Sequence, residues 1–193
     1  MTLRIALFGT SADPPTAGHQ VILHWLAQHY DQVAVWAADN PFKGHQTPLE
    51  HRSAMLQLMI EQLHWQHHGC SNLQLRQDLS SPRTVETLAK AKQIWENAEL
   101  TLVIGSDLLT QLPKWHHVDE LLRQVQLLVV PRAGYPITDV HLLELKNLGA
   151  KLAIAHLSPP AVSSTDYRQY QNSQTIPPTV EDYIHREGLY VRI

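Results

Sequence analysis

The sequence predicts an α/β protein with a doubly wound, mostly parallel Rossmann-like sheet and helices on both faces. Two observations support this prediction. Short apolar runs alternate with segments whose apolar residues recur at helical spacing. The runs at 100–104 and 127–130 are continuously apolar, which is typical of parallel strands that are buried on both faces. The 193 residues, 44% of them apolar, are expected to form a single domain.

The predicted elements alternate along the whole chain. An apolar run at 3–8 predicts the first strand, and a stripe from Val21 to His29 predicts the first helix. The C-terminal part, from about 157 to 193, is expected to be helical, with a last helix at 180–186 after two prolines. Further strands are expected at 33–37, 73–75 and 152–155, and further helices around the stripes at 55–63 and 85–95.

Composition excludes several classes of protein. The formal charge is −3 and no run of Lys and Arg is present, so no nucleic-acid partner is expected. The single cysteine, Cys70, cannot form an internal disulfide and fits a reducing cytosol. The chain opens without a signal-peptide pattern, and no apolar stretch approaches the roughly 20 residues that span a bilayer. We therefore expect a cytoplasmic protein with no membrane partner, and a homo-oligomer is compatible with the sequence.

Histidine is unusually frequent, with 13 residues. His64, His67 and His68 would share one face of a helix, a spacing that can bind a transition metal. The favoured interpretation is a helix C-terminus, in which Gly69 ends the helix and histidines complement its dipole. No metal site is assigned.

The loop GTSADPPTAGHQ (9–20) follows the first strand and precedes the first helix. It matches neither the dinucleotide fingerprint nor the P-loop. Gly9 is expected to turn the chain off the strand, and Thr16 to cap the helix. Gly18 and His19 then fall in the first turn, where free backbone N–H groups and the helix dipole favour an anion. The loop is therefore a candidate phosphate site.

A second anion site is predicted at VSSTDYR (162–168). Ser163 or Ser164 would cap a helix, and Arg168 lies about one turn further on, where its guanidinium can bind phosphate oxygens. The segments 9–19, 105–107 and 163–168 all follow predicted strands. Because ligands bind at the carboxyl ends of the strands in such sheets, the three segments are expected to form one site.

Together, T-x-G-H and S-S-T-x-x-R resemble the nucleotidyltransferase superfamily, and within it the bacterial nicotinate-nucleotide adenylyltransferases along nearly the whole chain. Some positions depart from that family: Thr10, Ala12 and Thr16 replace Gly, Phe and His, and Pro82-Arg83 replaces Ser-Tyr before Thr84. Further matching segments are Asn40-Pro41-Phe42-Lys43, His51-Arg52 with Met55-Leu56, 105–115, 131–135 and 183–190.

The resemblance implies that the phosphate of nicotinate mononucleotide attacks the α-phosphorus of ATP, giving deamido-NAD and pyrophosphate in NAD biosynthesis. A phosphate dianion is already a nucleophile, so catalysis reduces to alignment and charge stabilisation. The expected catalytic residues are His19, Thr16 and Arg168. Mg²⁺ is expected to arrive on the ATP phosphates rather than in an all-protein site.

The remaining site predictions divide between the two substrates. Lys43 and Arg132 are candidates for either the mononucleotide phosphate or the leaving pyrophosphate. The resemblance places the pyridine carboxylate at Thr84 and the pyridine ring on Trp115, which implies a preference for the acid over nicotinamide mononucleotide. ATP is expected at Gly9, Thr10, Ser11, Gly18, His19, Gly105, Asp107, Ser163, Ser164, Thr165 and Arg168, and the mononucleotide at Asp13, Asn40, Lys43, Thr84, Trp115 and Arg132.

Alternative functions stay open at this stage. Another adenylyltransferase of the superfamily would take nicotinamide mononucleotide or pantetheine phosphate, although the pantetheine-phosphate enzymes are shorter and lack the segments at 105–115 and 183–190. A non-catalytic nucleotide-binding regulator is favoured only by Thr10 and Ala12. His116 and His117 could add a donor for the carboxylate or lie at the surface.

Overall fold

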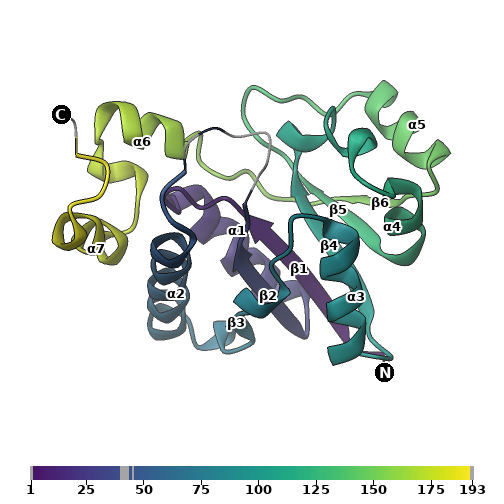
Figure 1. Cartoon of the computed structure of the whole chain (residues 1–193), viewed down its shortest axis with the longest axis horizontal. Coiled ribbons are helices and arrows are strands. Elements are labelled where there is room, and N and C mark those ends of the chain that lie inside the picture. The colour runs from purple at the N-terminus through teal and green to yellow at the C-terminus, as the bar shows by residue number, and fades with distance from the viewer. Residues whose placement is uncertain (1, 40–43, 45, 192–193) are drawn as a thin grey trace.

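A computed structural model describes residues 2–39, 44 and 46–191. Its sheet has six strands in the order β3-β2-β1-β4-β5-β6, and every neighbouring pair is parallel (Figure 1). The predicted fold class, a doubly wound α/β sheet, is confirmed. The strands are β1 Arg4–Thr10, β2 Gln32–Ala37, β3 Leu73–Leu75, β4 Glu99–Gly105, β5 Gln126–Val130 and β6 Lys151–Ile154.

The strand order reverses next to β1. The chain winds outward from β1 through β2 to β3 and then returns to place β4 on the other side of β1. At such a switch point the connections leave the two adjacent strands toward opposite faces, which opens a crevice at their carboxyl ends. The loops after β1 and β4 are therefore brought to one edge of the sheet.

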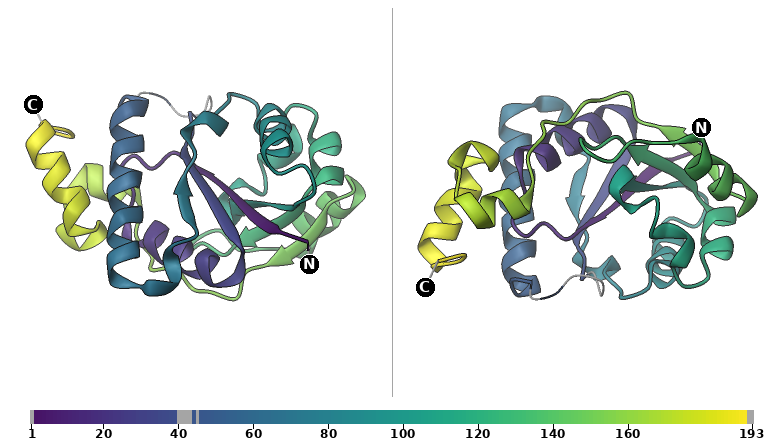
Figure 2. Two further views of the ribbon diagram at one scale, coloured as in Figure 1. Left: turned by 90° about the horizontal axis from the view of Figure 1, so that it is seen from below. Right: turned by 90° about the horizontal axis from the view of Figure 1, so that it is seen from above.

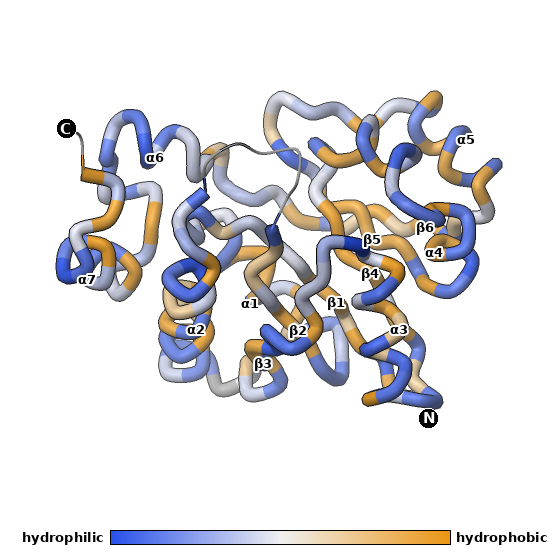
Figure 3. Tube along the Cα trace, in the orientation of Figure 1, coloured by the Kyte–Doolittle hydropathy of each residue, from blue (hydrophilic) through white to orange (hydrophobic). Residues whose placement is uncertain are grey.

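Alternate residues of the strands supply two separate apolar cores. Along β2, Val33 and Val35 face one core, whereas Ala34 and Trp36 face the other. Helices α1 and α2 cover the first face, and α3, α4 and α5 cover the second, whereas the C-terminal helices lie beyond α2, against which α7 packs (Figure 2). Figure 3 shows the hydrophobic residues concentrated along the central strands. The helices are α1 Ala17–His29, α2 Leu49–Gln66, α3 Thr84–Ile94, α4 Val118–Gln124, α5 Asp139–Asn147, α6 Ser164–Tyr170 and α7 Pro178–Glu187.

The C-terminal part is helical, as predicted, and consists of α6, a 3-10 turn and α7. Its buried residues Tyr167, Ile176, Val180 and Ile184 belong to the same core as α1 and α2. That shared core supports a single-domain organisation. No helix of the described residues is long and apolar enough to cross a membrane.

The histidine-rich segment is the C-terminus of a helix, as interpreted, and His64 lies in its last turn, but Gly69 does not end the helix. Helix α2 ends at Gln66, and His67 is its extended C-cap. Gly69 lies inside a 3-10 turn, not at the C′ position, and the three histidines do not share one helical face. The buried Cys70 explains the difference, because its N–H donates to the His67 carbonyl at 3.0 Å while its side chain enters the core. The ring of His67 instead lies 4.2 Å from that of His24.

Candidate active site

His19 is oriented by the start of its own helix. Thr16 is the N-cap of α1 and forms a capping box with His19. The Thr16 backbone N–H donates to Nδ1 of His19 at 3.0 Å. Since a backbone N–H can only donate, Nδ1 is an acceptor, and the proton of the neutral ring is on Nε2. Nε2 lies 2.9 Å from Oγ1 of Thr10, so it presents an N–H donor at the carboxyl end of β1.

The N-terminus of α1 has the properties of an anion site. Its first turn contains no acidic residue, and the capping residue Thr16 is buried. Backbone N–H groups at a helix start favour an anion, and no side-chain carboxylate of this first turn competes for them. Gly18 is buried beside the connection from β6 to α6, where an added Cβ would lie 3.8 Å from the Pro160 carbonyl and from Val162. The prediction of Thr16 as the cap is confirmed.

The role expected for Gly9 as the residue that turns the chain is wrong. Strand β1 continues through Thr10, and Gly9 pairs with Trp36 of β2. A Cβ at position 9 would lie 2.6 Å from the Trp36 indole, closer than any real contact. Glycine is thus required by the neighbouring tryptophan. The turn comes later, at Ala12, whose φ of 45° is in the left-handed region that most residues avoid.

The second motif lies against the first. Ser163 is the N-cap of α6, and the Ser164 hydroxyl donates to the Pro14 carbonyl at 2.8 Å. Nη1 of Arg168 donates to the Asp13 carbonyl, and Nη2 donates to the Thr165 hydroxyl at 3.3 Å. The structure therefore brings the two predicted phosphate-binding segments together.

The N-terminus of α6 differs from the predicted anion site. Asp166 lies in its first turn, and its N–H donates to Oγ of Ser163 at 3.0 Å. The Ser163 hydroxyl donates back to Oδ2 of Asp166 at 2.7 Å. The Asp166 carboxylate therefore accepts the hydrogen bond from the Ser163 hydroxyl that a phosphate bound at this helix start would otherwise accept. The cationic group of this motif is Arg168, whose side chain is 39% exposed.

The segment after β4 carries an ion pair. Nη1 of Arg132 lies 2.7 Å from Oδ2 of Asp107. The buried Ser106 fixes the backbone on both sides, because its hydroxyl accepts from the Arg132 N–H at 2.9 Å and donates to the Tyr135 carbonyl at 2.7 Å. A Cβ on Gly105 would displace the Asp107 carboxylate from its present position. Asp107 is predicted to bind ATP and Arg132 to bind the mononucleotide, and the two side chains contact each other.

The residues predicted for the pyridine ring lie at the start of α3 and after a 3-10 turn. Thr84 is the first residue of α3, and the half-buried Trp115 packs against the core that α3 and α4 share. His117 is the left-handed N-cap of α4. Loss of hydration, and then the charges of His117 and Arg83, lower the pKa of His116. Asn40 and Lys43 lie outside the described residues.

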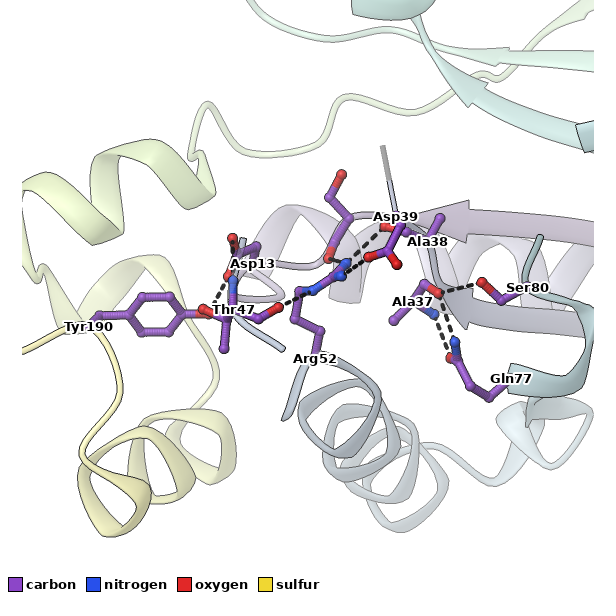
Figure 4. A network of polar contacts seen from close by, with 10 residues as sticks. Asp13, Ala37, Ala38, Asp39, Thr47, Arg52, Gln77, Ser80 and Tyr190 are labelled. Atoms are coloured by element: carbon purple, nitrogen blue, oxygen red, sulfur yellow. Dashed lines mark hydrogen bonds and ion pairs between the residues drawn. The ribbon is translucent and has the colours of Figure 1, made fainter. Parts of the chain in front are cut away.

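Arg52 is a residue that the site predictions missed. It is 1% exposed, and its guanidinium joins three segments of chain (Figure 4). Nε donates to the Thr47 carbonyl at 2.7 Å, and Nη1 donates to the carbonyls of Ser11 and Ala38 at 3.0 and 2.8 Å. Nη2 pairs with the Asp39 carboxylate. Arg52 thus fixes the first phosphate loop together with both ends of the segment that contains Asn40 and Lys43.

A sequence signal for Arg52 existed. The buried residues of α2 are Arg52, Met55, Leu56, Met59, Ile60 and Leu63, which recur at helical spacing. An arginine on the apolar stripe of a helix is buried only when its charge is paired and hydrogen-bonded.

Comparison with known proteins identifies the family of this chain. The family model of cytidylyltransferase-like proteins matches residues 7–170. A protein of Synechocystis sp. named probable nicotinate-nucleotide adenylyltransferase is 44% identical over 202 residues, which cover 97% of this chain and 99% of that protein. The nicotinate-nucleotide adenylyltransferase of Bacillus subtilis is 29% identical, with 97% and 98% covered. The chain belongs to the nicotinate-nucleotide adenylyltransferase family, within the cytidylyltransferase-like proteins.

Solved structures of other proteins have a similar fold to that of this chain. A solved structure of Plasmodium falciparum nicotinic acid mononucleotide adenylyltransferase complexed with NaAD has a TM-score of 0.80 at 20% identity and covers 97% of both chains. A second structure of that protein, complexed with APC, has a TM-score of 0.78 at 21% identity. At such identities the likeness establishes the fold.

Proposed function

We propose that the chain transfers AMP from ATP to nicotinate mononucleotide, giving deamido-NAD and pyrophosphate. The observation that carries the proposal is the meeting of the two motifs. His19, at the start of α1, and Arg168, on α6, both reach the loop after β1, where Arg168 bonds the Asp13 carbonyl. Family membership at 44% identity supports the same reaction.

The chemistry needs no protein nucleophile. A phosphate oxygen of the mononucleotide forms a bond to the α-phosphorus of ATP, while the bond from that phosphorus to the bridging oxygen breaks and its electron pair leaves with pyrophosphate. Negative charge grows on the non-bridging and leaving oxygens. The Nε2–H of His19, the N–H groups at the start of α1 and the Arg168 guanidinium are preorganised donors for that charge.

Enzymes that act on ATP generally need a divalent metal, and we expect Mg²⁺ to enter with the triphosphate. The donor set fits phosphate oxygens, because it consists of N–H groups, hydroxyls and a guanidinium. The carboxylates of Asp13, Asp107 and Asp166 have protein partners. Asp13 accepts from Tyr190 at 2.6 Å, Asp107 pairs with Arg132 at 2.7 Å, and Asp166 accepts from the Ser163 hydroxyl at 2.7 Å. Mg²⁺ bound through phosphate oxygens and water is common where the ion arrives with its nucleotide.

The acceptor side supports a pyridine mononucleotide. Trp115 offers a ring for stacking, and the Thr84 hydroxyl lies at the start of α3, where backbone N–H groups favour a carboxylate. His116 and His117, directly after Trp115, are candidates for a further donor. The direct roles of Asn40, Lys43 and Asp13 as mononucleotide ligands stay predictions.

The reaction is tested by pyrophosphate release. Purified protein is incubated with Mg²⁺ and ATP and with nicotinate mononucleotide, pantetheine phosphate or no acceptor. We expect release only with the mononucleotide, together with formation of deamido-NAD. Release with pantetheine phosphate alone would assign another adenylyltransferase, and ATP binding without release to any acceptor would indicate a regulator.

A further inference from the structure

Asp13 connects the first phosphate loop to the end of the chain. It is 5% exposed, and both its main chain and its carboxylate are engaged. The carbonyl accepts from Nη1 of Arg168. Oδ1 accepts from the Tyr190 hydroxyl at 2.6 Å, and Oδ2 accepts from the Thr47 N–H at 3.4 Å (Figure 4). Arg168 and Tyr190 thus both contact Asp13, Arg168 at the main-chain carbonyl and Tyr190 at the carboxylate.

The same carboxylate already forms a long ion pair with the cation of the site. Oδ2 of Asp13 lies 3.9 Å from Nη1 of Arg168, which is longer than a hydrogen bond. A buried carboxylate that lost its other donors would close this gap, because an unpaired buried charge is costly and a guanidinium is the strongest available partner. Such a pair would neutralise the charge that Arg168 offers to phosphate.

Tyr190 is fixed in place by the C-terminal segment. Gln171 Nε2 donates to its carbonyl at 2.9 Å, and its ring meets Tyr167 edge-on at 6.1 Å. Burial, and then the hydrogen bond to Asp13, raise the pKa of the Tyr190 hydroxyl, so it stays protonated and remains a donor. Its φ of 58° is left-handed, as is that of Gly188 two residues earlier. The end of the chain therefore delivers one hydroxyl to Oδ1 of Asp13.

We propose that Tyr190 is a positioning residue: its hydroxyl occupies the Asp13 carboxylate and so leaves the Arg168 guanidinium available for the phosphates of ATP. This inference rests on the proposed function for the identity of the ligand. The last turn of the chain, remote in sequence from either motif, then sets the affinity for ATP.

The first variant is Tyr190→Phe, which removes one oxygen. We expect the KM for ATP to rise about five- to tenfold, while kcat and the KM for the mononucleotide stay within about twofold. The matched control is Tyr170→Phe in the same segment, at a side chain exposed to solvent, which should leave all three constants unchanged. Equal changes in both KM values would indicate a general structural role and would overturn the proposal.

The second variant distinguishes two explanations of weaker ATP binding. In one, the Asp13 carboxylate competes for Arg168; in the other, the loop at 9–20 loses structural support. Asp13→Asn keeps an oxygen for Tyr190 but removes the charge that competes for Arg168. We expect the double variant Asp13→Asn/Tyr190→Phe to bind ATP within about twofold of wild type, and Asp13→Asn alone to bind it at least as well as wild type does. A double variant that binds ATP no better than Tyr190→Phe would contradict the inference.

The binding of ATP is measured by titration calorimetry, with thermal unfolding recorded for each variant. Calorimetry does not depend on turnover, so a wild-type protein that binds ATP without releasing pyrophosphate would refute the proposed function and still test Tyr190. If Tyr190→Phe does not fold, Asp13→Asn alone decides, because weaker ATP binding in that variant would overturn the proposal.

Discussion

The two halves of the candidate site are built differently. The nucleotide side, residues 9–19 with 163–168, is supported by buried polar groups: Asp13, Thr16 and Arg52 are at most 5% exposed. The acceptor side, residues 83–84, 108–117 and 131–135, carries more exposed residues, and its Arg132 side chain is 45% exposed. Buried, fully bonded networks are rigid before a ligand arrives, whereas exposed ion pairs in water rearrange at little cost. We infer that the first half fixes the chemistry and the second adapts to the acceptor.

The largest effect is expected at the centre of the nucleotide side. His19→Ala removes the Nε2–H donor, and losing one preorganised donor of this type typically lowers kcat by about 10²–10³-fold. Pyrophosphate release at saturating ATP and mononucleotide measures it. His29→Ala, at the exposed end of the same helix, is the control and should retain wild-type kcat. Near-normal turnover by His19→Ala would remove this residue from catalysis.

The contrast in rigidity between the two halves is tested by replacing one arginine in each half with methionine. Arg52→Met leaves buried carbonyls of three segments without their donor, so we expect the free energy of unfolding to fall by about 3 kcal/mol. Arg132→Met removes a half-exposed ion pair, for which about 1 kcal/mol or less is expected. Denaturant unfolding of both variants gives the two values, and similar losses would mean that the two halves are equally rigid.

The smallest change is Arg168→Lys, which keeps the charge and loses the guanidinium fork. Lysine cannot bond both the Asp13 carbonyl and Thr165 in the same geometry, so kcat/KM for ATP should fall about tenfold. The KM for the mononucleotide should stay within about twofold if the nucleotide side binds ATP independently of the acceptor side. Steady-state kinetics with each substrate varied in turn decides the point, and unchanged ATP kinetics would leave α6 as no more than a capped helix.

The sequence predicted the parts of the fold that depend on local patterns. The apolar runs marked all six strands, and the order of Thr16, Gly18 and His19 located the anion-binding helix start. Helices α4 and α5 were missed. Both are short, with seven and nine residues. The buried stripe of α4, Val118, Leu121 and Leu122, spans only about two turns, and α5 buries only Leu145 among its described residues.

The contacts between distant segments were beyond local reasoning. Gly9 looks like a loop glycine until Trp36 is found across the strand pair, 2.6 Å from where its Cβ would be. Asp13 resembles a ligand-binding residue in sequence, and its partner Tyr190 is 177 positions away. Arg52 could have been found, because its position on the buried stripe of α2 is visible in the sequence. Its bonds to Ser11, Ala38 and Thr47 depend on how β1 and β2 end side by side.

The central claim is adenylyl transfer to the acid form of the mononucleotide. It is tested most directly by the ratio of kcat/KM for nicotinate over nicotinamide mononucleotide, with ATP saturating. Because N–H and hydroxyl donors at the start of α3 would be left unpaired by the neutral amide, the ratio should be about 10² or more. A ratio near one, or one that favours the amide, would contradict the assignment.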